Sequence, residues 1–333
     1  MAKNALDQIF ERAQGSTKRI VLPEGTDERV LKAATLAAKA NLGRIVLLGD
    51  EDVILSRIPK KLHSNLTVIN PERAKSDALA QTLYELRKHK GMTLGEARVL
   101  IKKPIMFATM MLYSGDADGV VAGVTMPTAD AIRPALQIIK TRAGINKVSS
   151  VMLMRMPENR PLGEKGVMLF ADCGIIPEPA ADDLADIAIS TADTARALAG
   201  IIPRVAMLSF STASKKDTGY VSVEKVKQAT AIVKRRRPDI IIDGEIQADA
   251  AIAADVAKIK CPNSILSGRA NCLIFPDLNC ANIAYKLVSR IGGVEAVGPV
   301  LQGLKKPVND LSRGANSQEI FQAIAVTILQ SQG

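Results

Sequence analysis

Arg19-Ile-Val-Leu-Pro23 and Arg44-Ile-Val-Leu-Leu-Gly49 are two short apolar runs, and residues 27–40 between them carry apolar side chains at helical spacing. Continuous apolar strands joined by amphipathic helices are typical of parallel sheets that helices cover on both faces. The same alternation continues along nearly the whole chain. The sequence therefore predicts an α/β fold built on parallel sheets.

The rest of the chain repeats this pattern, with one polar interruption. Further apolar runs predict strands at residues 66–70, 119–123, 151–156, 166–172, 205–210, 239–243 and 264–275. Amphipathic segments predict helices at residues 73–88, 179–198, 221–237 and 277–291. The polar stretch Thr141–Lys147 indicates a domain boundary. Pro157–Gly166 is a polar loop typical of a hairpin, so the second sheet is expected to be mixed rather than purely parallel.

Composition narrows the class of protein. Hydrophobic residues make up 47% and charged residues 23% of the 333 residues, which is the balance of a soluble globular protein. No uncharged apolar run approaches the ~20 residues that a membrane-spanning helix needs. Four cysteines without a C-x-x-C pair, and two histidines, predict neither a metal site nor a disulfide framework. We therefore expect free thiols in a reducing cytoplasm.

The net charge of +10 raises the question of a nucleic-acid partner. The basic residues are scattered in pairs apart from the cluster Lys234–Arg237, which precedes Pro238 at the end of a predicted helix. Cations suit that position electrostatically. Aromatic residues are only 3%, so the stacking platforms of single-strand binders are lacking. We expect a small polyanionic ligand rather than a nucleic acid.

The segment Lys306–Glu319 concentrates candidate chemistry. Ser312, Arg313 and Gly314 supply a hydroxyl, a guanidinium and a flexible backbone, and Glu319 adds a carboxylate. A helix N-terminus offers free N–H groups to an anion, and an arginine fork suits phosphate or a developing oxyanion. Spacing also supports a purely structural interpretation, because Asn316 and Glu319 have the spacing of a capping box.

Two further arginines are candidates for the same anion site. Thr128 and Arg133 follow the strand predicted at 119–123, and ligands of open α/β sheets bind at the carboxyl ends of strands. Arg87 ends a predicted helix within a basic cluster. Taken alone, Arg87 is more typical of a solvated helix arginine, whereas the position of Arg133 after a strand favours the anion site over that interpretation.

The chain resembles the phosphate acetyltransferase (phosphotransacetylase) family over essentially its full length. The matching segments, in collinear order, are Val21–Arg29, Arg87–Gly91, Thr128–Lys140, Phe170–Cys173, Met207–Thr212, Asp243–Gln247, Ile274–Asn279 and Asn309–Gly314. The resemblance implies a fold of two α/β/α domains with a cleft between them, of the isocitrate/isopropylmalate dehydrogenase-like type. It places residues 1–145 with 296–333 in a first domain closed by the C-terminal segment, and residues 146–295 in a second.

The reaction implied is acetyl-CoA plus phosphate giving acetyl phosphate plus CoA, reversibly and through a ternary complex. By resemblance, Arg87, Arg133 and Arg313 would hold the phosphoryl group and polarise the acyl carbonyl. Thr128 is added to the substrate-binding residues because of its position after the strand. Ser312 and Glu319 would complete the catalytic group, Ser312 by hydrogen bonding and Glu319 as acceptor of the CoA thiol proton.

The resemblance also implies the ligands and the setting of the reaction. Ser312, Arg313 and Arg290 would contact CoA, and CoA is a substrate, so neither cofactor nor metal is expected. A cytoplasmic homodimer of acetate metabolism is implied, with no membrane and no nucleic acid as partner.

Two positions depart from the family pattern. Glu319 stands where the family usually has aspartate, which moves the carboxylate by one methylene. Val124–Thr128 stands where the family often has a polar residue or histidine followed by serine. Both departures bear on how the substrates would be held.

Alternative functions remain open at this stage. One is a phosphate acyltransferase for propionyl or butyryl groups, and another is a non-catalytic regulatory relative that binds acetyl-CoA or acetyl phosphate. An oxidoreductase is least favoured, because no G-x-G-x-x-G motif occurs in the sequence.

Overall fold

The computed structural model describes residues 5–159, 162–212 and 219–332 of the chain. These residues divide into two compact units, each built around its own sheet. The five-stranded unit consists of Ile9–Arg142 and Leu304–Gly333, and the six-stranded unit of Ala143–Gly303 together with Met1–Gln8. In the described part of the chain, no helix is long and apolar enough to cross a membrane.

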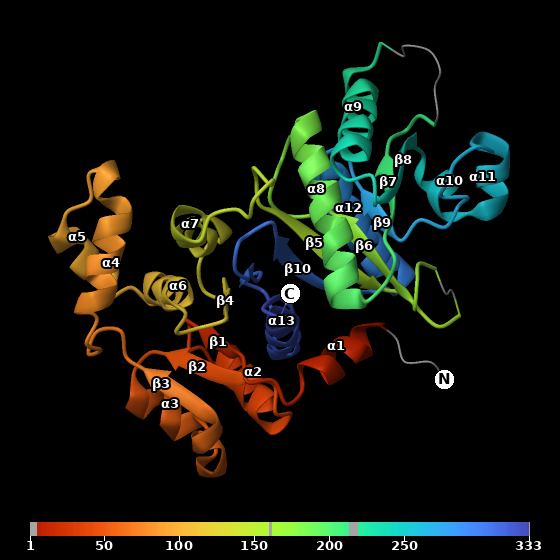
Figure 1. Cartoon of the computed structure of the whole chain (residues 1–333). Coiled ribbons are helices and arrows are strands. Elements are labelled where there is room, and N and C mark those ends of the chain that lie inside the picture. Colours follow the sequence, from red (N-terminus) through yellow and green to blue (C-terminus); the bar gives the residue numbers. More distant parts are fainter. Residues whose placement is uncertain (1–4, 160–161, 213–218, 333) are drawn as a thin grey trace. The chain divides into compact units, whose positions relative to one another are not determined.

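The five-stranded unit holds a parallel sheet with the strand order β11-β4-β1-β2-β3. Figure 1 labels four of these strands, β1 to β4. Its strands are β1 (Arg19–Leu22), β2 (Arg44–Leu48), β3 (Leu66–Ile69), β4 (Gly119–Ala122) and β11 (Val308–Asp310). Its helices are α2 (Glu28–Lys39), α3 (Glu51–Arg57), α4 (Asp77–Arg87), α5 (Leu94–Leu100), α6 (Pro104–Ser114), α7 (Thr128–Ile138) and α13 (Ser317–Gln330), with the 3₁₀ turns η1 (Lys60–Asn65) and η2 (Lys88–Lys90). Helix α1 (Ala5–Ala13) runs from one unit into the other.

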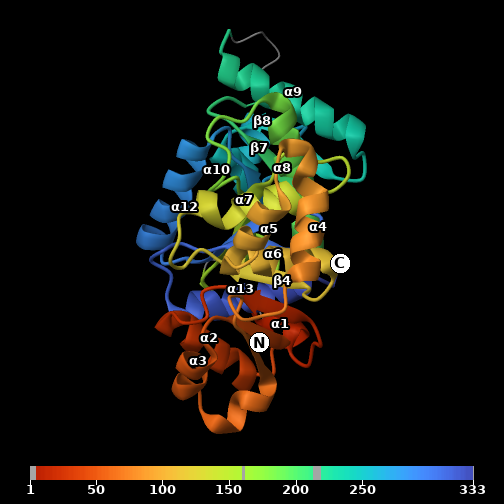
Figure 2. The same ribbon diagram turned by 90° about the vertical axis from the view of Figure 1, so that its left-hand side faces the viewer.

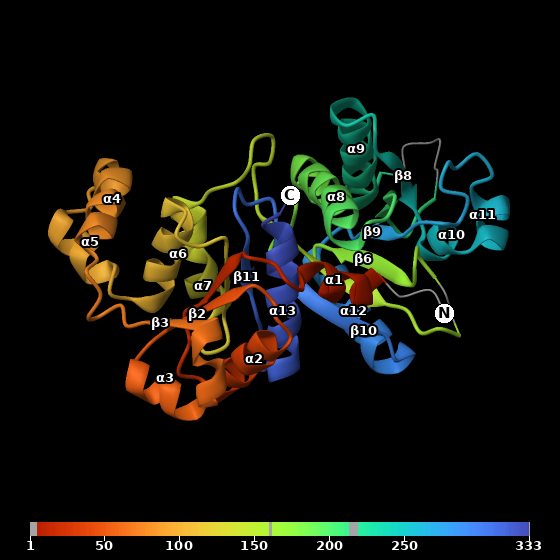
Figure 3. The same cartoon turned by 60° about the horizontal axis from the view of Figure 1, so that its bottom comes forward.

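Alternate strand residues of this sheet enter two apolar layers, as the strand period of two requires. Val21, Val46 and Val120 pack with residues of α6 and α7. Their neighbours Ile20 and Leu47 are equally buried, on the side where α2 and α13 contact the strands. Helix α13 lies beside α2 (Figure 3). The continuous apolar runs in the sequence are thus explained by burial on both faces.

The six-stranded unit holds a mixed sheet with the order β10-β5-β6-β9-β7-β8. Its strands are β5 (Ser149–Arg155), β6 (Val167–Ala171), β7 (Arg204–Leu208), β8 (Ile241–Ile246), β9 (Cys272–Ile274) and β10 (Glu295–Gln302). Its helices are α8 (Ala181–Thr194), which continues as the π-helical turn η3 (Ala195–Ala199), α9 (Val221–Arg236), α10 (Ala248–Ile252), α11 (Ala254–Lys260) and α12 (Leu278–Gly292). Helices α8 and α9 pack side by side (Figure 2). Strand β5 is antiparallel to β6 and β10, which confirms the predicted hairpin and mixed sheet.

Two segments differ from the sequence prediction. Of residues 264–275 only β9 is a strand, because Ser267 and Gly268 take left-handed backbone conformations, which end an extended segment. Strand β10 was not predicted, since Pro299 interrupts it; the register shifts between Val297 and Val300 at that point. An edge strand tolerates proline at such a bulge. Residues 296–303, expected with the first domain, therefore belong to the six-stranded unit, where β10 pairs with β5.

Candidate active site

Three loops of the five-stranded unit meet at one edge of its sheet. Strands β11, β4 and β1 are neighbours and parallel, so their carboxyl ends lie at the same edge. The loops that follow them are residues 311–316, 123–127 and 23–27. This is the edge where open α/β sheets bind ligands, and it receives Ser312, Arg313 and Thr128.

The turn Ser312–Ala315 is fixed at both ends while its side chains face solvent. Leu311 N donates to Ala122 O at 2.8 Å, and Ala315 N donates to Ser312 O at 2.8 Å. Leu311 and Ala315 are buried, whereas Ser312, Arg313 and Gly314 are exposed. Ser312 Oγ accepts a bond from Gly314 N at 3.2 Å. The hydroxyl and the guanidinium are therefore presented on a held backbone rather than on a loose loop.

Arg29 joins this turn to the neighbouring loop. Its Nη1 donates to Arg313 O at 2.7 Å and to Ala315 O at 3.1 Å, and its Nη2 donates to Val124 O at 3.0 Å. Asp27 holds the same guanidinium through Nε at 3.1 Å and Nη2 at 3.0 Å. That side-chain bond lowers the pKa of Asp27 below its ordinary value. We call this arrangement the Arg29 clamp.

The sequence analysis assigned no role to Arg29, although the residue lies in a segment that carries the family resemblance. The sequence does contain a signal that Arg29 has partners in the folded protein. Arg29 stands in the first turn of α2, where the helix dipole disfavours a cation. A cation at that position indicates partners elsewhere, here the carbonyls of two other loops.

Glu24 fixes the loop that leads to α7. Its carboxylate accepts bonds from Val124 N at 2.9 Å, Thr125 N at 2.6 Å and Thr125 Oγ1 at 2.6 Å. Glu24 is itself buried. Charge-assisted bonds to backbone N–H groups are among the stronger ones in proteins, so this loop is held as firmly as the turn.

Asp310 is a buried carboxyl directly behind the turn. Only 4% of the residue is exposed, and it accepts a hydrogen bond from the Thr128 side chain. Its Oδ1 is buried without a hydrogen-bond partner in the described part of the chain. Gly123, at φ +100°, allows this close packing, because a Cβ there would lie 2.1 Å from that oxygen. Burial, with a contribution from the Glu24 charge, raises the pKa of Asp310 to about 6.

Thr128 and Arg133 lie on α7 at the same edge. Both are exposed. Arg133 Nη1 lies 3.4 Å from Asp130 Oδ1, in an ion pair whose side chains are 62% and 53% exposed. Such surface pairs contribute at most ~1 kcal/mol, so Arg133 can exchange this partner for an anionic ligand at little cost.

Arg87 ends α4, whose helix packs on α5 and α6. Its Nε is buried and lacks a hydrogen-bond partner among the described residues. No contact recorded in the described part of the chain joins Arg87 to the turn or to Arg133. The structure thus brings Ser312, Arg313 and Thr128 into one connected edge but does not tie Arg87 into it.

Glu319 lies in the first turn of α13, and Arg290 lies on α12. Glu319 Oε2 accepts from Asn316 N at 2.9 Å, and Asn316 Oδ1 accepts from Glu319 N at 3.0 Å, which is the capping box that the spacing predicted. The Glu319 carboxylate is thus engaged at the start of α13. Arg290 is exposed on α12 of the six-stranded unit.

Comparison with known proteins identifies the family. The phosphate acetyl/butaryl transferase family profile matches residues 4–328. The chain is 48% identical over 328 residues to the phosphate acetyltransferase of Thermoanaerobacterium thermosaccharolyticum, covering 98% of this chain and 99% of that protein. It is 46% identical over 331 residues to that of Clostridium acetobutylicum, with 98% of each covered. A phosphotransacetylase structure from Streptococcus pyogenes matches with a TM-score of 0.91 and 40% identity over 98% of both chains. The chain therefore belongs to the phosphate acetyl/butaryl transferase family.

Proposed function

We propose that the chain is a phosphate acetyltransferase, which moves an acetyl group reversibly between CoA and inorganic phosphate in a ternary complex. Full-length identity of 48% to a protein of that name supports the reaction. The single structural observation that carries the proposal is the Ser312–Ala315 turn, which the Arg29 clamp holds while Ser312 and Arg313 are exposed. No cofactor or metal takes part in this scheme, and CoA is a substrate.

The proposed chemistry is a direct acyl transfer. In the direction of thioester formation, the CoA sulfur attacks the carbonyl carbon of acetyl phosphate, and the carbon–oxygen bond to phosphate breaks. Arg313 stabilises the carbonyl oxygen as it becomes negative, and Ser312 Oγ donates a hydrogen bond to it. Arg87, Arg133 and Thr128 hold the phosphoryl group, which leaves as phosphate. Holding both substrates in attack geometry can contribute ~7–11 kcal/mol.

The thiol proton passes to Glu319 in this scheme and then to the departing phosphate, which leaves as hydrogen phosphate. A carboxylate is a much weaker base than a thiolate, so Arg313 has to stabilise the thiolate while the proton moves. Glu319 occupies the capping box in the structure, and it must release Asn316 N to accept the proton. An exposed N–H group can bond to water instead, so this release costs little. Arg290, exposed on α12, is proposed to meet the CoA phosphates.

Two other functions give different results in the same assay. A propionyl or butyryl transferase would prefer longer acyl-CoA substrates, with each methylene contributing ~1–3 kcal/mol in a pocket. A regulatory relative would bind CoA without releasing phosphate from acetyl phosphate. Rates measured across acyl lengths, together with CoA binding, separate the three.

We also propose a cytoplasmic homodimer. Helix α12 exposes Ile283, Leu287 and Ile291, an apolar stripe at i, i+4 and i+8 that a second copy would cover. Analytical ultracentrifugation of the native chain and of Leu287→Lys tests the dimer: a monomeric native protein contradicts it.

The deciding experiment follows thioester formation from CoA and acetyl phosphate by ultraviolet absorbance. Native protein is expected to turn over, and Ser312→Ala and Arg133→Ala are each expected to lose about 100-fold or more in kcat/KM without a change in Tm. Arg19→Ala is the matched control, because Arg19 lies at the amino end of β1, at the opposite edge of the sheet. Near-native turnover in both site variants would refute the site.

A Glu319→Asp variant examines the departure from the family pattern. If the site is adjusted to glutamate, this variant is slower than native, because a carboxylate displaced by about 1 Å can cost ~100-fold. An inactive native protein that the aspartate restores would instead support the regulatory relative.

A further inference from the structure

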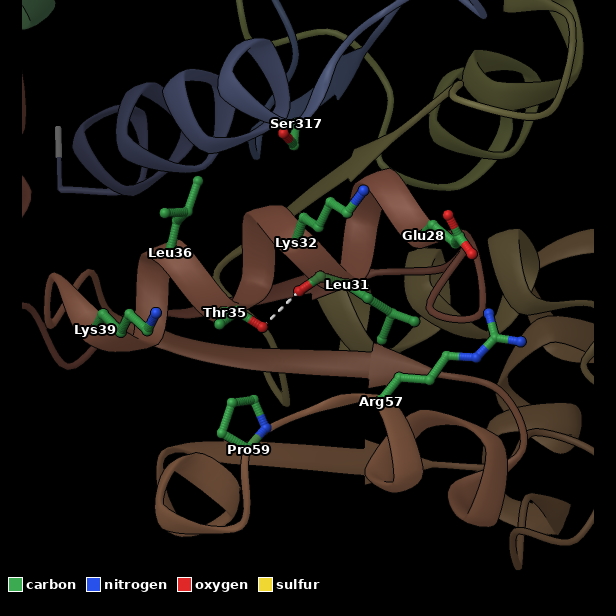
Figure 4. Close-up of a pocket in the computed structure, with 9 residues that line it drawn as sticks. All are labelled: Glu28, Leu31, Lys32, Thr35, Leu36, Lys39, Arg57, Pro59 and Ser317. Atoms are coloured by element: carbon green, nitrogen blue, oxygen red, sulfur yellow. Dashed lines mark hydrogen bonds between the residues drawn. The ribbon is translucent and has the colours of Figure 1, made fainter.

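A cavity of about 880 Å³ opens on the outer face of α2, and none of the residues assigned to acetyl transfer lines it. It is bounded by the α3–η1 connection on one side and by the first residue of α13, Ser317, on the other (Figure 4). Ligand pockets for small molecules occupy roughly 300–1,000 Å³. The space is therefore far larger than a phosphate ion needs.

Three cations line this cavity. Lys32 and Lys39 come from α2, and Arg57 from the end of α3. All three are exposed, and no ion pair or hydrogen bond of their side chains is recorded in the described part of the chain. One acid, Glu28, is among the lining residues, so the cavity carries a net positive charge. By contrast, Lys18 and Arg19 of the same unit share Asp118.

The cations are spread along a groove with an apolar floor. Lys32 and Lys39 are seven residues apart on α2, which separates their Cα atoms by roughly 10 Å. Figure 4 shows Arg57 extending toward the Glu28 end of the helix. Leu31 and Pro59 add apolar surface between the charges. A ligand that matches this lining has several negative charges at one end, and an extended part with apolar faces and hydroxyl groups, for which Glu28 is an acceptor.

We propose that this cavity binds a nucleoside polyphosphate as a regulatory ligand. The phosphates pair with Lys32 and Arg57, and the nucleoside lies along the groove on Leu31 and Pro59. An inorganic anion would leave most of the volume and the apolar floor unused. A double-stranded nucleic acid would need a continuous basic face rather than a groove with three cations.

The position of the cavity couples it to the active site. Helix α2 carries both Lys32 in the cavity and Arg29, which clamps the carbonyls of the turn. Ser317 lines the cavity one residue after Asn316, whose capping box includes Glu319. A ligand in the groove therefore contacts the two helices whose first turns support Arg313 and Glu319. Differential binding to two arrangements of these helices changes turnover without competition at the site.

The test measures binding of ADP and ATP to the native chain by calorimetry, with CoA present at saturation. CoA itself contains an adenine nucleotide, so saturating CoA fills its own site first. We expect the nucleotide to bind under these conditions and to change kcat. In Lys32→Gln/Arg57→Gln we expect the Kd to rise at least tenfold and the effect on kcat to disappear.

The matched control is Lys75→Gln/Lys102→Gln, which removes two exposed cations of the same unit outside the cavity. Its nucleotide affinity is expected to equal that of the native chain. Absence of binding, displacement of the nucleotide by CoA, or equal weakening in both double variants would overturn the site. Inorganic triphosphate binding as tightly as ATP would overturn the nucleoside class, and binding without any change in kcat would overturn the regulatory role. The binding result does not depend on the assigned reaction.

Discussion

Asp172 and Asp310 are buried carboxyls at strand ends in the two units, and they differ in how fully they are bonded. Asp172 follows β6 and is 3% exposed; its two oxygens accept from Ser150 N at 3.0 Å, Ser150 Oγ at 2.5 Å, Gly174 N at 3.0 Å and Ile176 N at 2.8 Å. Asp310 ends β11 and accepts from Thr128, while its Oδ1 has no partner among the described residues. The fully hydrogen-bonded carboxyl of Asp172 organises a loop, whereas the incompletely hydrogen-bonded carboxyl of Asp310 lies behind an exposed turn.

The same distinction separates the arginines of the five-stranded unit. Arg29 bonds to three carbonyls and a carboxylate, whereas Arg313 and Arg133 are exposed. Fully bonded groups therefore build the edge of the sheet, and the exposed arginines at that edge are the ones that we propose to bind substrate. Each of the following predictions tests this division, from the largest expected effect to the smallest.

Removal of the fully hydrogen-bonded carboxyl of Asp172 should mainly lower the stability of the protein rather than its activity. Asp172→Ala leaves several buried N–H groups without an acceptor, and we expect a loss of about 3–5 kcal/mol in the free energy of unfolding of the six-stranded unit. Urea unfolding followed by circular dichroism measures it. Asp255→Ala, at an exposed position on α11, is the control. A change below about 1 kcal/mol would mean that the Asp172 network is not architectural.

Loosening the clamp should affect catalysis through the turn. Arg29→Ala frees the carbonyls of Arg313 and Ala315, and we expect kcat/KM to fall about 10–100-fold, equivalent to ~1.4–2.7 kcal/mol. Arg29→Lys restores a charge but not the fork, so it should recover only part of the loss. Steady-state kinetics of the native protein and both variants measures kcat/KM, and equal Tm values show that the variants are folded. Full activity in Arg29→Ala would show that the turn keeps its conformation without the clamp.

The incompletely hydrogen-bonded carboxyl of Asp310 should make the stability of the protein depend on pH. The folded-state pKa of Asp310 is raised to about 6 by burial, so the folded protein binds this proton more tightly than the unfolded chain does. Stability from this group therefore falls as pH rises from about 4 to 6, and the penalty is complete above the folded pKa.

Between pH 7.5 and pH 5 the native chain should gain about 1 kcal/mol in unfolding free energy from this group. Asp310→Asn should lack that gain. Urea titrations of both proteins at the two pH values measure the difference. Identical pH dependence in the two would place the Asp310 proton outside this range.

Much of the fold was predictable because its signals are local. The sequences of β1 and β2 are continuously apolar, which indicates burial on both faces. The polar loop between β5 and β6 indicates the hairpin. Strand β10 is not predictable from its own sequence, because Pro299 interrupts the strand pattern. Only the pairing with β5 in the folded protein defines this strand. The first part of residues 264–275 is wrongly predicted as strand, because the left-handed backbone at Ser267 leaves no mark in hydrophobic periodicity.

The candidate site was predictable in its residue types but not in its supports. Ser312, Arg313 and Thr128 were found from motif and position, and the structure places them at one sheet edge. Their supports, Arg29 and Asp310, are brought close by strand pairing, with Arg29 and Arg313 separated by 284 residues in sequence. Spacing along the chain carries no information about such contacts.

The most direct test of the account is the rate of thioester formation by Arg313→Ala beside Arg19→Ala. Both variants remove one exposed arginine from the five-stranded unit, at opposite edges of its sheet. The account predicts that Arg313→Ala loses about 100-fold or more in kcat/KM at unchanged Tm, while Arg19→Ala stays close to native. Near-native turnover in Arg313→Ala, or an equal loss in both variants, would contradict it.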